Sequence, residues 1–343
     1  MSKPCFHASI EGAQHGAKTL DQFLAFAKSS GAAGAQPSNY MLQEGSKFKT
    51  AKEIQNAFDQ HGLKLDGISA HCPFWVHTTA WTASPTVRPF IPAEVAALSP
   101  EKIEAWAESY VLRLLELCQQ LGVKILPMFW GTAFGWETAS GYPWGFWNGP
   151  GYDLIKEGGE RFASKTAKIR QTARQAGIFL AHEIHPGTAA MTAEDFLLLV
   201  KVCDGDPCLT VNADPSHCWE GESWEDRFRA ISDRVLAAHV KNYTIRPGIA
   251  LRKMAPDWKD RAMQFVDLAS GDLSMPRYVE MLIGIGYPAR YCRITGSTTA
   301  PLVVEAESAY RGLDATSAAG IAYTRDHLCF PVAEGSFEDG MGA

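Results

Sequence analysis

The sequence lacks the long hydrophobic runs that a membrane protein needs. None of its 343 residues lies in an apolar stretch of about 18 or more, which is roughly the minimum for a helix that crosses a bilayer. The first residues, MSKPC, do not lead into the apolar core of a secretory signal peptide. We therefore expect a protein that does not enter a membrane and that resides in the cytoplasm.

Paired cysteines and an excess of positive charge are also missing. The eight cysteines include no CxxC pair, so a thiolate zinc site is not expected, and a chain of this length most simply keeps its thiols reduced. Acidic residues outnumber basic ones by 38 to 32, which gives a net charge of −6. The chain as a whole therefore has no net electrostatic attraction for nucleic acid or anionic membranes. The net charge does not exclude a local basic cleft.

A dinucleotide fingerprint and a repeat of fixed period are absent as well. No GxGxxG follows the first predicted strand, which argues against a Rossmann-type site. What the sequence does contain is a regular alternation of short apolar segments and segments with helical periodicity. The predicted strands are 5–10, 33–37, 65–71, 123–129, 178–184, 208–213, 235–240 and 301–305. The predicted helices are 20–30, 50–61, 100–121, 159–176 and 308–327, with three more that begin near 192, 223 and 275.

Eight such β-α units predict a (β/α)8 TIM barrel, with a doubly wound α/β sheet as the alternative fold. The barrel is expected to occupy residues 1–333 as a single domain, with long loops after its third, fourth and seventh strands. Residues 334–343 are acidic and rich in glycine, and we expect them to form a flexible tail. The helix near 192 has a predicted start, because Thr192 is followed three residues later by Asp195 in a capping-box pattern.

Four acidic or histidine residues occur near the ends of four successive predicted strands: Glu183, Asp214, His239 and Glu305. The carboxyl ends of the strands of a parallel barrel meet at one rim, where the active sites of this fold lie. Carboxylates with one imidazole suit a hard or borderline divalent metal. A metal there can polarise a carbonyl and stabilise an enediolate. Glu307 shares the face of Glu305 and is the alternative fourth ligand.

Two further side chains share a face with predicted ligands, because side chains alternate along a strand. His185 lies two residues beyond Glu183, and Lys241 lies two beyond His239. An imidazole titrates near about pH 6.5, so His185 is a candidate general base, with orientation of Glu183 or capping of the following Pro-Gly turn as the alternative. Lys241 either neutralises an oxyanion or lies solvated at the rim of the barrel.

These motifs resemble the xylose-isomerase-like barrel superfamily, in its sugar phosphate isomerase/epimerase branch. The resemblance rests on HEIHPG at 182–187, DPSH at 214–217, HVK at 239–241 and VVEAE at 303–307, and elsewhere on the order of the elements. It implies that Glu183, Asp214, His239 and Glu305 bind one divalent ion. Mn²⁺ is the expected ion, with Mg²⁺ and Co²⁺ as the alternatives.

The resemblance also implies roles for single residues. Glu183 and Glu305 would act as acid and base on opposite faces of the substrate. His217, the last residue of the DPSH motif, would contact a substrate oxygen. His71, at the end of the third predicted strand, is similar to a histidine of the family that touches the substrate.

An aromatic loop follows the fourth predicted strand, with FWGTAFGW at 129–136 and YPWGFW at 142–147. Aromatic faces pack against sugar C–H surfaces and flat aryl groups, so we expect Trp130 and this loop to bind a bulky or apolar part of the substrate. A subunit interface or a packed lid is the alternative. No glycine-rich phosphate cradle is present, which argues against a phosphorylated sugar.

These observations predict a metal-dependent sugar isomerase or epimerase that removes a proton next to a sugar carbonyl, and a homo-oligomer is expected. The alternative is a lyase, the large subunit of a C-glycoside deglycosidase. It would expel an aryl aglycone from a 3-oxo-glycoside with His185 as base, and it would need a small β-rich partner subunit.

Two other functions fit the sequence less well. An endonuclease-IV-like DNA repair enzyme needs a histidine-rich cluster of three metals, and no histidine lies between His77 and His182 or between His239 and His327. A net negative charge also disfavours binding to a phosphate backbone. A binding protein without catalytic activity would have no need for four residues of the types that bind a divalent metal.

Overall fold

The structure is a computed structural model that describes residues 5–133, 154–219, 221–251, 257–308 and 310–332. Eight strands form one sheet in the order β5, β2, β1, β12, β9, β8, β7, β6, and every neighbouring pair is parallel. The strands are β1 (Phe6–Glu11), β2 (Gly34–Gln36), β5 (Lys64–Leu65), β6 (Ile125–Met128), β7 (Phe179–Glu183), β8 (Leu209–Ala213), β9 (Val235–Val240) and β12 (Ala300–Val304).

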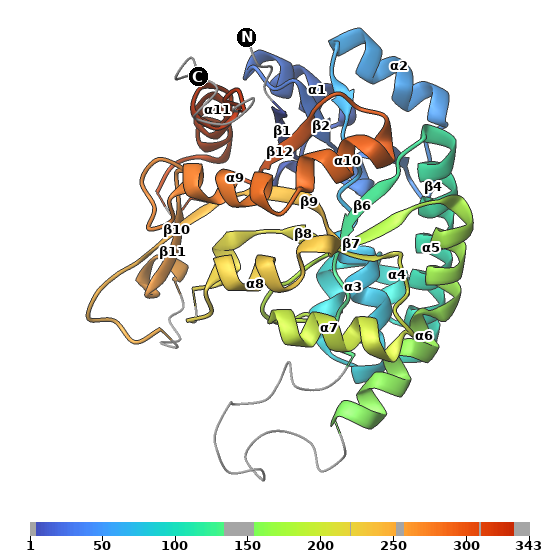
Figure 1. The fold of residues 1–343 in the computed structure, drawn as a ribbon. Coiled ribbons are helices and arrows are strands. Elements are labelled where there is room, and N and C mark those ends of the chain that lie inside the picture. The colour runs from blue at the N-terminus through green and yellow to red at the C-terminus, as the bar shows by residue number, and fades with distance from the viewer. Residues whose placement is uncertain (1–4, 134–153, 220, 252–256, 309, 333–343) are drawn as a thin grey trace, which may run out of the picture.

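The sheet curls around a common interior, and the helices lie outside it (Figure 1). The amide of Ala70, a few residues after β5, donates to the carbonyl of Pro127 in β6 over 3.0 Å, which links the two ends of the sheet. The (β/α)8 barrel that the alternating pattern predicts is thereby confirmed.

Several of the helices that surround the barrel begin at side-chain caps that the sequence marks. Thr19, Thr50 and Thr192 each form a capping box with the residue three positions later, and this satisfies amides that a helix start leaves unpaired. The box predicted at Thr192 is confirmed. The main helices are α1 (Leu20–Ser29), α2 (Ala51–His61), α5 (Pro100–Leu121), α6 (Leu154–Ala176), α7 (Ala193–Val202), α8 (Trp224–Ala230), α9 (Met275–Gly284), α10 (Tyr287–Thr295) and α11 (Leu313–Tyr323).

The strands are buried on both faces, which explains their nearly continuous apolar sequences. All six residues of β1 are buried, because helices cover the outer face and the barrel interior covers the other. Alternation along β1 directs His7, Ser9 and Glu11 into the interior, and His7 there pairs with Asp66 over 2.9 Å. The barrel interior therefore contains polar side chains at some heights along its axis, and Glu11 lies at the height of the carboxyl ends of the strands.

The third β-α unit is the main difference from the predicted elements. Residues 65–71 were expected to form a strand, but β5 ends at Leu65, and His71 is the first residue of a helix, α3 (His71–Thr79). The segment after it, expected as a long loop, contains 3-10 turns and the short helix α4 (Ala93–Ala96). Apolar residues of α3 and of the following turns pack on α5 in a small core of their own, and this packing makes the segment helical.

The remaining loops differ from the prediction in detail. The charged loop expected after the seventh strand contains an antiparallel hairpin of β10 (Asn242–Ile245) and β11 (Met263–Val266). The last helix was predicted from residue 308 but begins at Leu313, and it continues into a π-helical turn at Thr324–Leu328. Most of the aromatic loop, at 134–153, and the predicted flexible tail at 334–343 lie outside the described residues.

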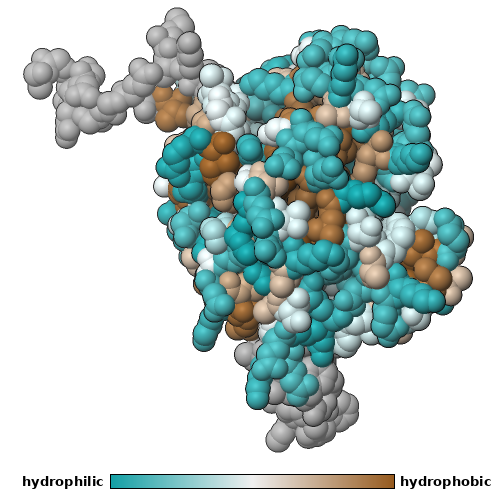
Figure 2. Space-filling view, turned by 90° about the vertical axis from the view of Figure 1, so that its right-hand side faces the viewer, coloured by the Kyte–Doolittle hydropathy of each residue, from teal (hydrophilic) through white to brown (hydrophobic). Residues whose placement is uncertain are grey.

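The hydropathy of the outer surface is that expected of a barrel whose helices each bury one face and expose the other to solvent. The face shown in Figure 2 is mostly hydrophilic, with hydrophobic residues gathered in separate patches. Within the described part of the chain, no helix combines the length and apolarity that crossing a membrane requires.

Candidate metal centre and active site

The four residues predicted as metal ligands all lie at the carboxyl ends of neighbouring strands. Glu183 is the last residue of β7, and His239 is the last but one of β9. Asp214 directly follows β8 and caps a short 3-10 turn, where its Oδ1 accepts from the amide of Ser216 over 2.8 Å. Glu305 directly follows β12. Since β7, β8, β9 and β12 are adjacent in the sheet, the four side chains meet at one rim.

The ligand atoms of these four residues all lie within 4.8 Å of one another. Nδ1 of His239 is 3.2 Å from Oε2 of Glu183 and 3.1 Å from Oε2 of Glu305, and it is 3.9 Å from Oδ2 of Asp214. Glu183, Asp214 and His239 are at most 1% exposed. The tertiary structure therefore assembles the set that the sequence pattern proposes.

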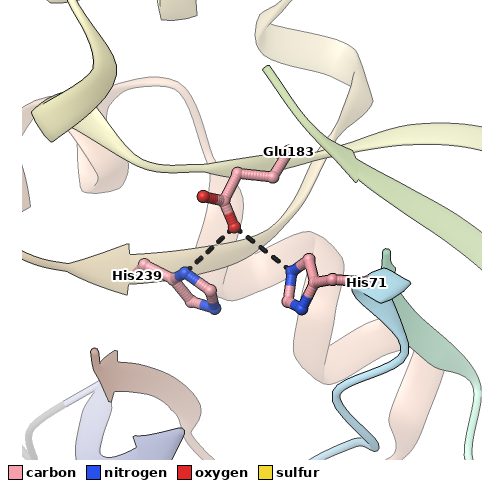
Figure 3. Close-up of side chains that lie close together, drawn as sticks. All are labelled: His71, Glu183 and His239. Atoms are coloured by element: carbon pink, nitrogen blue, oxygen red, sulfur yellow. Dashed lines mark ion pairs between the residues drawn. The ribbon is translucent and has the colours of Figure 1, made fainter. Parts of the chain in front are cut away.

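His71 joins the same cluster from a different element. Its Nε2 lies 3.3 Å from Oε2 of Glu183, the same oxygen that Nδ1 of His239 approaches, so the two imidazoles face one carboxylate oxygen (Figure 3). His71, Glu183 and His239 form a second group that could hold a metal. The sequence placed His71 at the end of a strand, whereas the structure delivers it from the first turn of α3.

Glu305 and Glu307 occupy different environments. Glu305 contacts His239, whereas Oε2 of Glu307 lies 3.0 Å from Nζ of Lys241, and its side chain is 36% exposed. Lys241 is buried, and its ammonium also contacts Glu305 over 3.2 Å and lies 4.2 Å from the ring centre of Phe265. The geometry thus favours Glu305 over Glu307 as the fourth ligand, and it places Lys241 inside the site rather than at a solvated rim.

His217 and Asn212 hold the carboxylate of Glu183 from two sides. Nε2 of His217 lies 3.0 Å from Oε1 of Glu183 and 3.4 Å from Oδ2 of Asp214. The amide of Asn212, a buried residue of β8, donates to Oε2 of Glu183 over 3.0 Å. The sequence analysis did not select Asn212, although its position two residues before Asp214 on an inward-facing strand is a usable signal.

The charges of the cluster depend strongly on one another. Burial would raise the pKa of Glu183, but the His239 imidazole and the hydrogen bond from His217 hold it well below the usual range of a carboxyl. Burial would lower the pKa of His239, but Glu183 and Glu305 raise it well above that of a free imidazole. Burial would likewise lower the pKa of His217, yet Asp214 and Glu183 raise it to about 9.

Glu11 is a buried carboxylate of the site that the sequence analysis missed. It is the last residue of β1 and is 1% exposed. Neither carboxylate oxygen forms a hydrogen bond of normal geometry, although the nearby Ser69 hydroxyl interacts with the carboxyl and opposes the rise in its pKa that burial causes. Its Oε2 lies 3.6 Å from Nε2 of His239, and its Oε1 lies 4.0 Å from Nδ1 of His71. The predicted first strand ended at Ile10, one residue too early, so the strand-end rule that selected the other carboxylates was not applied to Glu11.

The predicted base His185 and the predicted substrate residue Trp130 lie beside the cluster rather than in it. The His185 ring packs against His217 and Phe129, with ring centres 4.0 and 5.1 Å away, and its Nδ1 lies 2.6 Å from the carbonyl oxygen of Pro186. Trp130 is fully buried and packs edge-on against Phe74 and Phe162. A substrate contact was expected for Trp130, but its ring supports the wall from behind, and the neighbouring Phe129 lines the open space instead.

Two hollows are lined by residues next to the cluster, within the part of the chain that the structure describes. The first has a volume of about 470 Å³, and its walls include Gln14, Trp258, Gln264, Phe265, Glu307 and Arg311. Gln14 connects it to the cluster, because its amide donates to Oε1 of Glu305 over 2.5 Å. The second, of about 300 Å³, is lined mainly by apolar and aromatic side chains: Cys72, Trp75, Phe90, Phe129, His185 and Pro186.

The donor set fits a divalent cation. The carboxylates of Glu183, Asp214 and Glu305 surround the imidazole of His239. The pKa of His239 is raised because Glu183 and Glu305 favour a positive charge beside them, and a divalent cation would supply that positive charge in place of the proton. Oδ2 of Asp214 is buried without a hydrogen-bond partner and is directed at His239. Carboxylate oxygens with an imidazole nitrogen are ligands for metals such as Mn²⁺, Mg²⁺ and Co²⁺.

TIM barrels hold their active sites at the carboxyl ends of the strands, which is where this chain carries its buried carboxylates and imidazoles. The chain belongs to the xylose isomerase-like TIM barrel family, whose sequence signature matches residues 24–307. No curated protein matches the chain significantly.

Several solved structures share the fold at low sequence identity. The 3-keto-D-glucoside 4-epimerase YcjR of E. coli is 14% identical with a TM-score of 0.61, and the alignment covers 94% of this chain and 99% of that one. The probable 3-DHS dehydratase AsbF of Bacillus anthracis is 16% identical with a TM-score of 0.59 and coverage of 94% and 99%. A D-allulose 3-epimerase of Methylomonas sp. is 13% identical with a TM-score of 0.57 and coverage of 96% and 100%.

Proposed function

We propose that the protein is a divalent-metal-dependent sugar isomerase or epimerase that acts by removing a proton next to a sugar carbonyl. The observation that carries this proposal is the convergence of Glu183, Asp214, His239 and Glu305 within 4.8 Å at the rim of the barrel. We further propose that the substrate is an unphosphorylated carbohydrate and that the protein acts in the cytoplasm as a homo-oligomer.

These four residues would hold the ion, with Mn²⁺ as our first choice. When bound, the divalent ion would supply a positive charge that polarises the sugar carbonyl and stabilises the negative charge developing on its oxygen. The residues of the chain then have to bind the sugar, move one proton and exclude water.

Glu183 is the proposed base. Its low pKa keeps it ionised, and His217 and Asn212 fix its orientation. It takes the proton from the carbon next to the carbonyl. The electrons of that C–H bond form a carbon–carbon double bond, and the carbonyl π electrons move to the oxygen. Return of the proton by Glu183 to the former carbonyl carbon gives an isomer, provided that a proton also moves from the hydroxyl of the original carbon to the former carbonyl oxygen. Protonation of the original carbon from the opposite face by Glu305, in its protonated form, gives an epimer.

Buried polar residues around the two carboxylates would bind the sugar hydroxyls. His71 and Lys241 project into the site with 7% and 3% exposure, and Gln14 reaches the site from the first hollow. Lys241 lowers the pKa of Glu305 against the opposing effect of burial, so Glu305 serves as the acid only after it has taken up a proton. The names of two relatives, a 3-keto-D-glucoside 4-epimerase and a D-allulose 3-epimerase, support a sugar carbonyl as the reacting group.

A lyase acting on 3-oxo-glycosides is the second candidate, and the apolar hollow beside His185 favours it. Its aromatic wall, formed by Trp75, Phe90 and Phe129, suits a flat aglycone. Removal of the proton next to the 3-oxo group by His185 would form a carbon–carbon double bond. The bond to the aglycone would break, and its electron pair would leave with the aglycone, which then takes up a proton. This candidate requires a small β-rich partner subunit.

One assay separates these candidates. The protein is stripped of metal by chelation, reconstituted with Mn²⁺, and incubated with free ketohexoses and with a 3-oxo-aryl-glucoside, and the products are followed by chromatography and mass spectrometry. A product of unchanged mass supports the isomerase or epimerase, and a free aglycone supports the lyase. Undiminished turnover in the metal-free protein would contradict both.

The substitution Glu183→Gln tests the proposed base. Loss of a positioned base typically slows a reaction about 10²–10⁴-fold, so we expect a fall in turnover of that size. The matched control is Glu104→Gln on α5, where the carboxylate pairs with Lys165 on the outside of the barrel. Wild-type turnover in Glu183→Gln would exclude the proposed proton transfer.

A further inference from the structure

Glu11 lies on the side of the His239 ring that faces away from the other proposed metal ligands. It lies on β1, between β2 and β12 in the sheet, and it is buried with two carboxylate oxygens that form no hydrogen bond of normal geometry. The next residue has to be glycine, because a Cβ on Gly12 would lie 2.6 Å from the backbone nitrogen of Ser38. The amide of Gly12 donates to the carbonyl of Gln36 over 2.8 Å, so the end of β1 is held firmly in place.

The imidazole of His239 separates Glu11 from the other carboxylates. Nδ1 of His239 faces Glu183, Asp214 and Glu305, whereas Nε2 on the opposite side of the ring faces Glu11 over 3.6 Å. A neutral imidazole that offers the lone pair of Nδ1 to a cation carries its proton on Nε2. That N–H is fully buried and therefore needs an acceptor.

Asn212 does not provide this acceptor in its present orientation. Its Nδ2 lies 3.0 Å from Nε2 of His239 and also donates to Oε2 of Glu183 over 3.0 Å. Exchange of its oxygen and nitrogen would direct Oδ1 at the Glu183 carboxylate and replace an attraction by a repulsion. In its present orientation Asn212 presents an N–H donor to Nε2, so a proton on Nε2 requires this amide nitrogen to move away, and Glu11 is the neighbouring carboxylate that can accept from Nε2.

We propose that Glu11 is a positioning residue that accepts a hydrogen bond from Nε2 of His239 and thereby keeps the Nδ1 lone pair directed at a divalent cation. This inference rests on the metal site of the proposed function. Carboxylate partners of metal-binding histidines commonly fix the tautomer and the ring orientation in this way, and their removal typically weakens metal affinity about 10–100-fold. A small movement that shortens the 3.6 Å separation would complete the hydrogen bond.

The test measures Mn²⁺ affinity from the electron paramagnetic resonance signal of the free ion. Wild type is compared with Glu11→Leu, which has no acceptor, and with Glu11→Gln, which keeps a neutral one. We expect Glu11→Leu to bind Mn²⁺ about 10–100-fold more weakly and Glu11→Gln to lie between it and wild type. The matched control is Asp66→Asn, which also removes a buried carboxylate beside an imidazole, that of His7, but near the start of β1. We expect wild-type affinity in this control.

A second measurement detects the tautomer itself. In the Mg²⁺-loaded protein with ¹⁵N-labelled histidine, nuclear magnetic resonance should show the proton of His239 on Nε2 in wild type and in Asp66→Asn, but a mixture of states in Glu11→Leu. A general loss of stability would not select one tautomer.

The possible outcomes separate this inference from the function on which it rests. If wild type binds no Mn²⁺, the proposed metal site and the role of Glu11 fall together. If wild type binds Mn²⁺ but Glu11→Leu binds it equally well, or no more weakly than Asp66→Asn does, only the role of Glu11 is overturned. Weaker binding in Asn212→Ala with unchanged binding in Glu11→Leu would assign the acceptor to Asn212.

Discussion

At the scale of single residues, Glu305 and Glu307 show that burial and neighbouring side chains can give two nearby carboxylates different roles. Both follow β12, and both contact Lys241. Glu305 is largely buried and reaches His239, whereas the more exposed Glu307 lines the first hollow. We therefore propose that Glu305 binds the metal and that Glu307 lies on the substrate side of the site.

The pair Glu305→Gln and Glu307→Gln tests this assignment with the same chemical change at positions two residues apart. Removing one of three ligand carboxylates should weaken Mn²⁺ binding by at least the factor of about 10–100 seen for residues that merely support ligands. Glu307→Gln should keep the Mn²⁺ dissociation constant within about twofold and change mainly KM. Titration calorimetry with Mn²⁺ and steady-state kinetics provide the two readouts.

The opposite result would be equally clear. Weak metal binding in Glu307→Gln together with normal binding in Glu305→Gln would assign the fourth ligand to Glu307. Because both substitutions remove one negative charge beside Lys241, a change in net charge cannot account for a difference between them.

At the scale of elements, the hairpin of β10 and β11 forms one wall of the site, since Gln264 and Phe265 of β11 line the first hollow. The hairpin is attached to the barrel through Asn242, a fully buried residue. Its amide nitrogen donates to the carbonyls of Leu268 and Leu273 over 2.8 and 3.0 Å. Its oxygen accepts from the amides of Tyr243 and Leu273 over 2.9 and 3.1 Å.

Asn242→Ala should therefore destabilise the protein and loosen this wall. Each buried polar group left without a partner costs about 1–3 kcal/mol, and backbone rearrangement will satisfy some of the four, so we expect a loss of about 2–4 kcal/mol. Urea unfolding measures the loss, and a raised KM would report the movement of Phe265. The comparison is Thr244→Val on the same hairpin, which removes an exposed hydrogen bond to Asp272 and should cost under about 0.5 kcal/mol. Equal effects of the two substitutions would contradict the anchoring role of Asn242.

At the scale of the whole molecule, the cluster connects the barrel to metal binding. It joins β7, β8, β9 and β12 with α3 through carboxylates and imidazoles that could hold a metal ion. A cation that binds only the folded chain stabilises it by an amount that grows with its concentration. The metal-free protein should accordingly be the less stable form.

Mn²⁺ at a concentration of about 100 times its dissociation constant should add about 2.7 kcal/mol to the free energy of unfolding. For a chain of this size, we expect a rise in Tm on the order of 5 °C, measured by differential scanning calorimetry before and after chelation. Asp214→Asn keeps the shape of the side chain but removes one ligand charge, and it should abolish most of the rise. An unchanged Tm on addition of Mn²⁺ to wild type would argue against a metal site in the folded protein.

The sequence by itself determined the fold class and most of the candidate site. Alternating apolar and helical segments predicted the barrel, because strands buried on both faces must be apolar throughout. The strand-end rule selected Glu183, Asp214, His239 and Glu305, because parallel strands bring their carboxyl ends to one rim. These inferences use local periodicity and the order of elements, and both can be read from the sequence alone.

Only the tertiary structure decided the features that depend on contacts between distant segments. Packing on α5 made the segment after β5 helical and brought His71 to the site from α3. Glu11, which lay one residue beyond the predicted first strand, is the last residue of β1, and its carboxylate faces Nε2 of His239. Glu305 is more buried than Glu307, which distinguishes the two carboxylates. Trp130 is fully buried in the packed interior. Partners that lie tens to hundreds of residues apart in the sequence set each of these outcomes, so no local pattern could have predicted them.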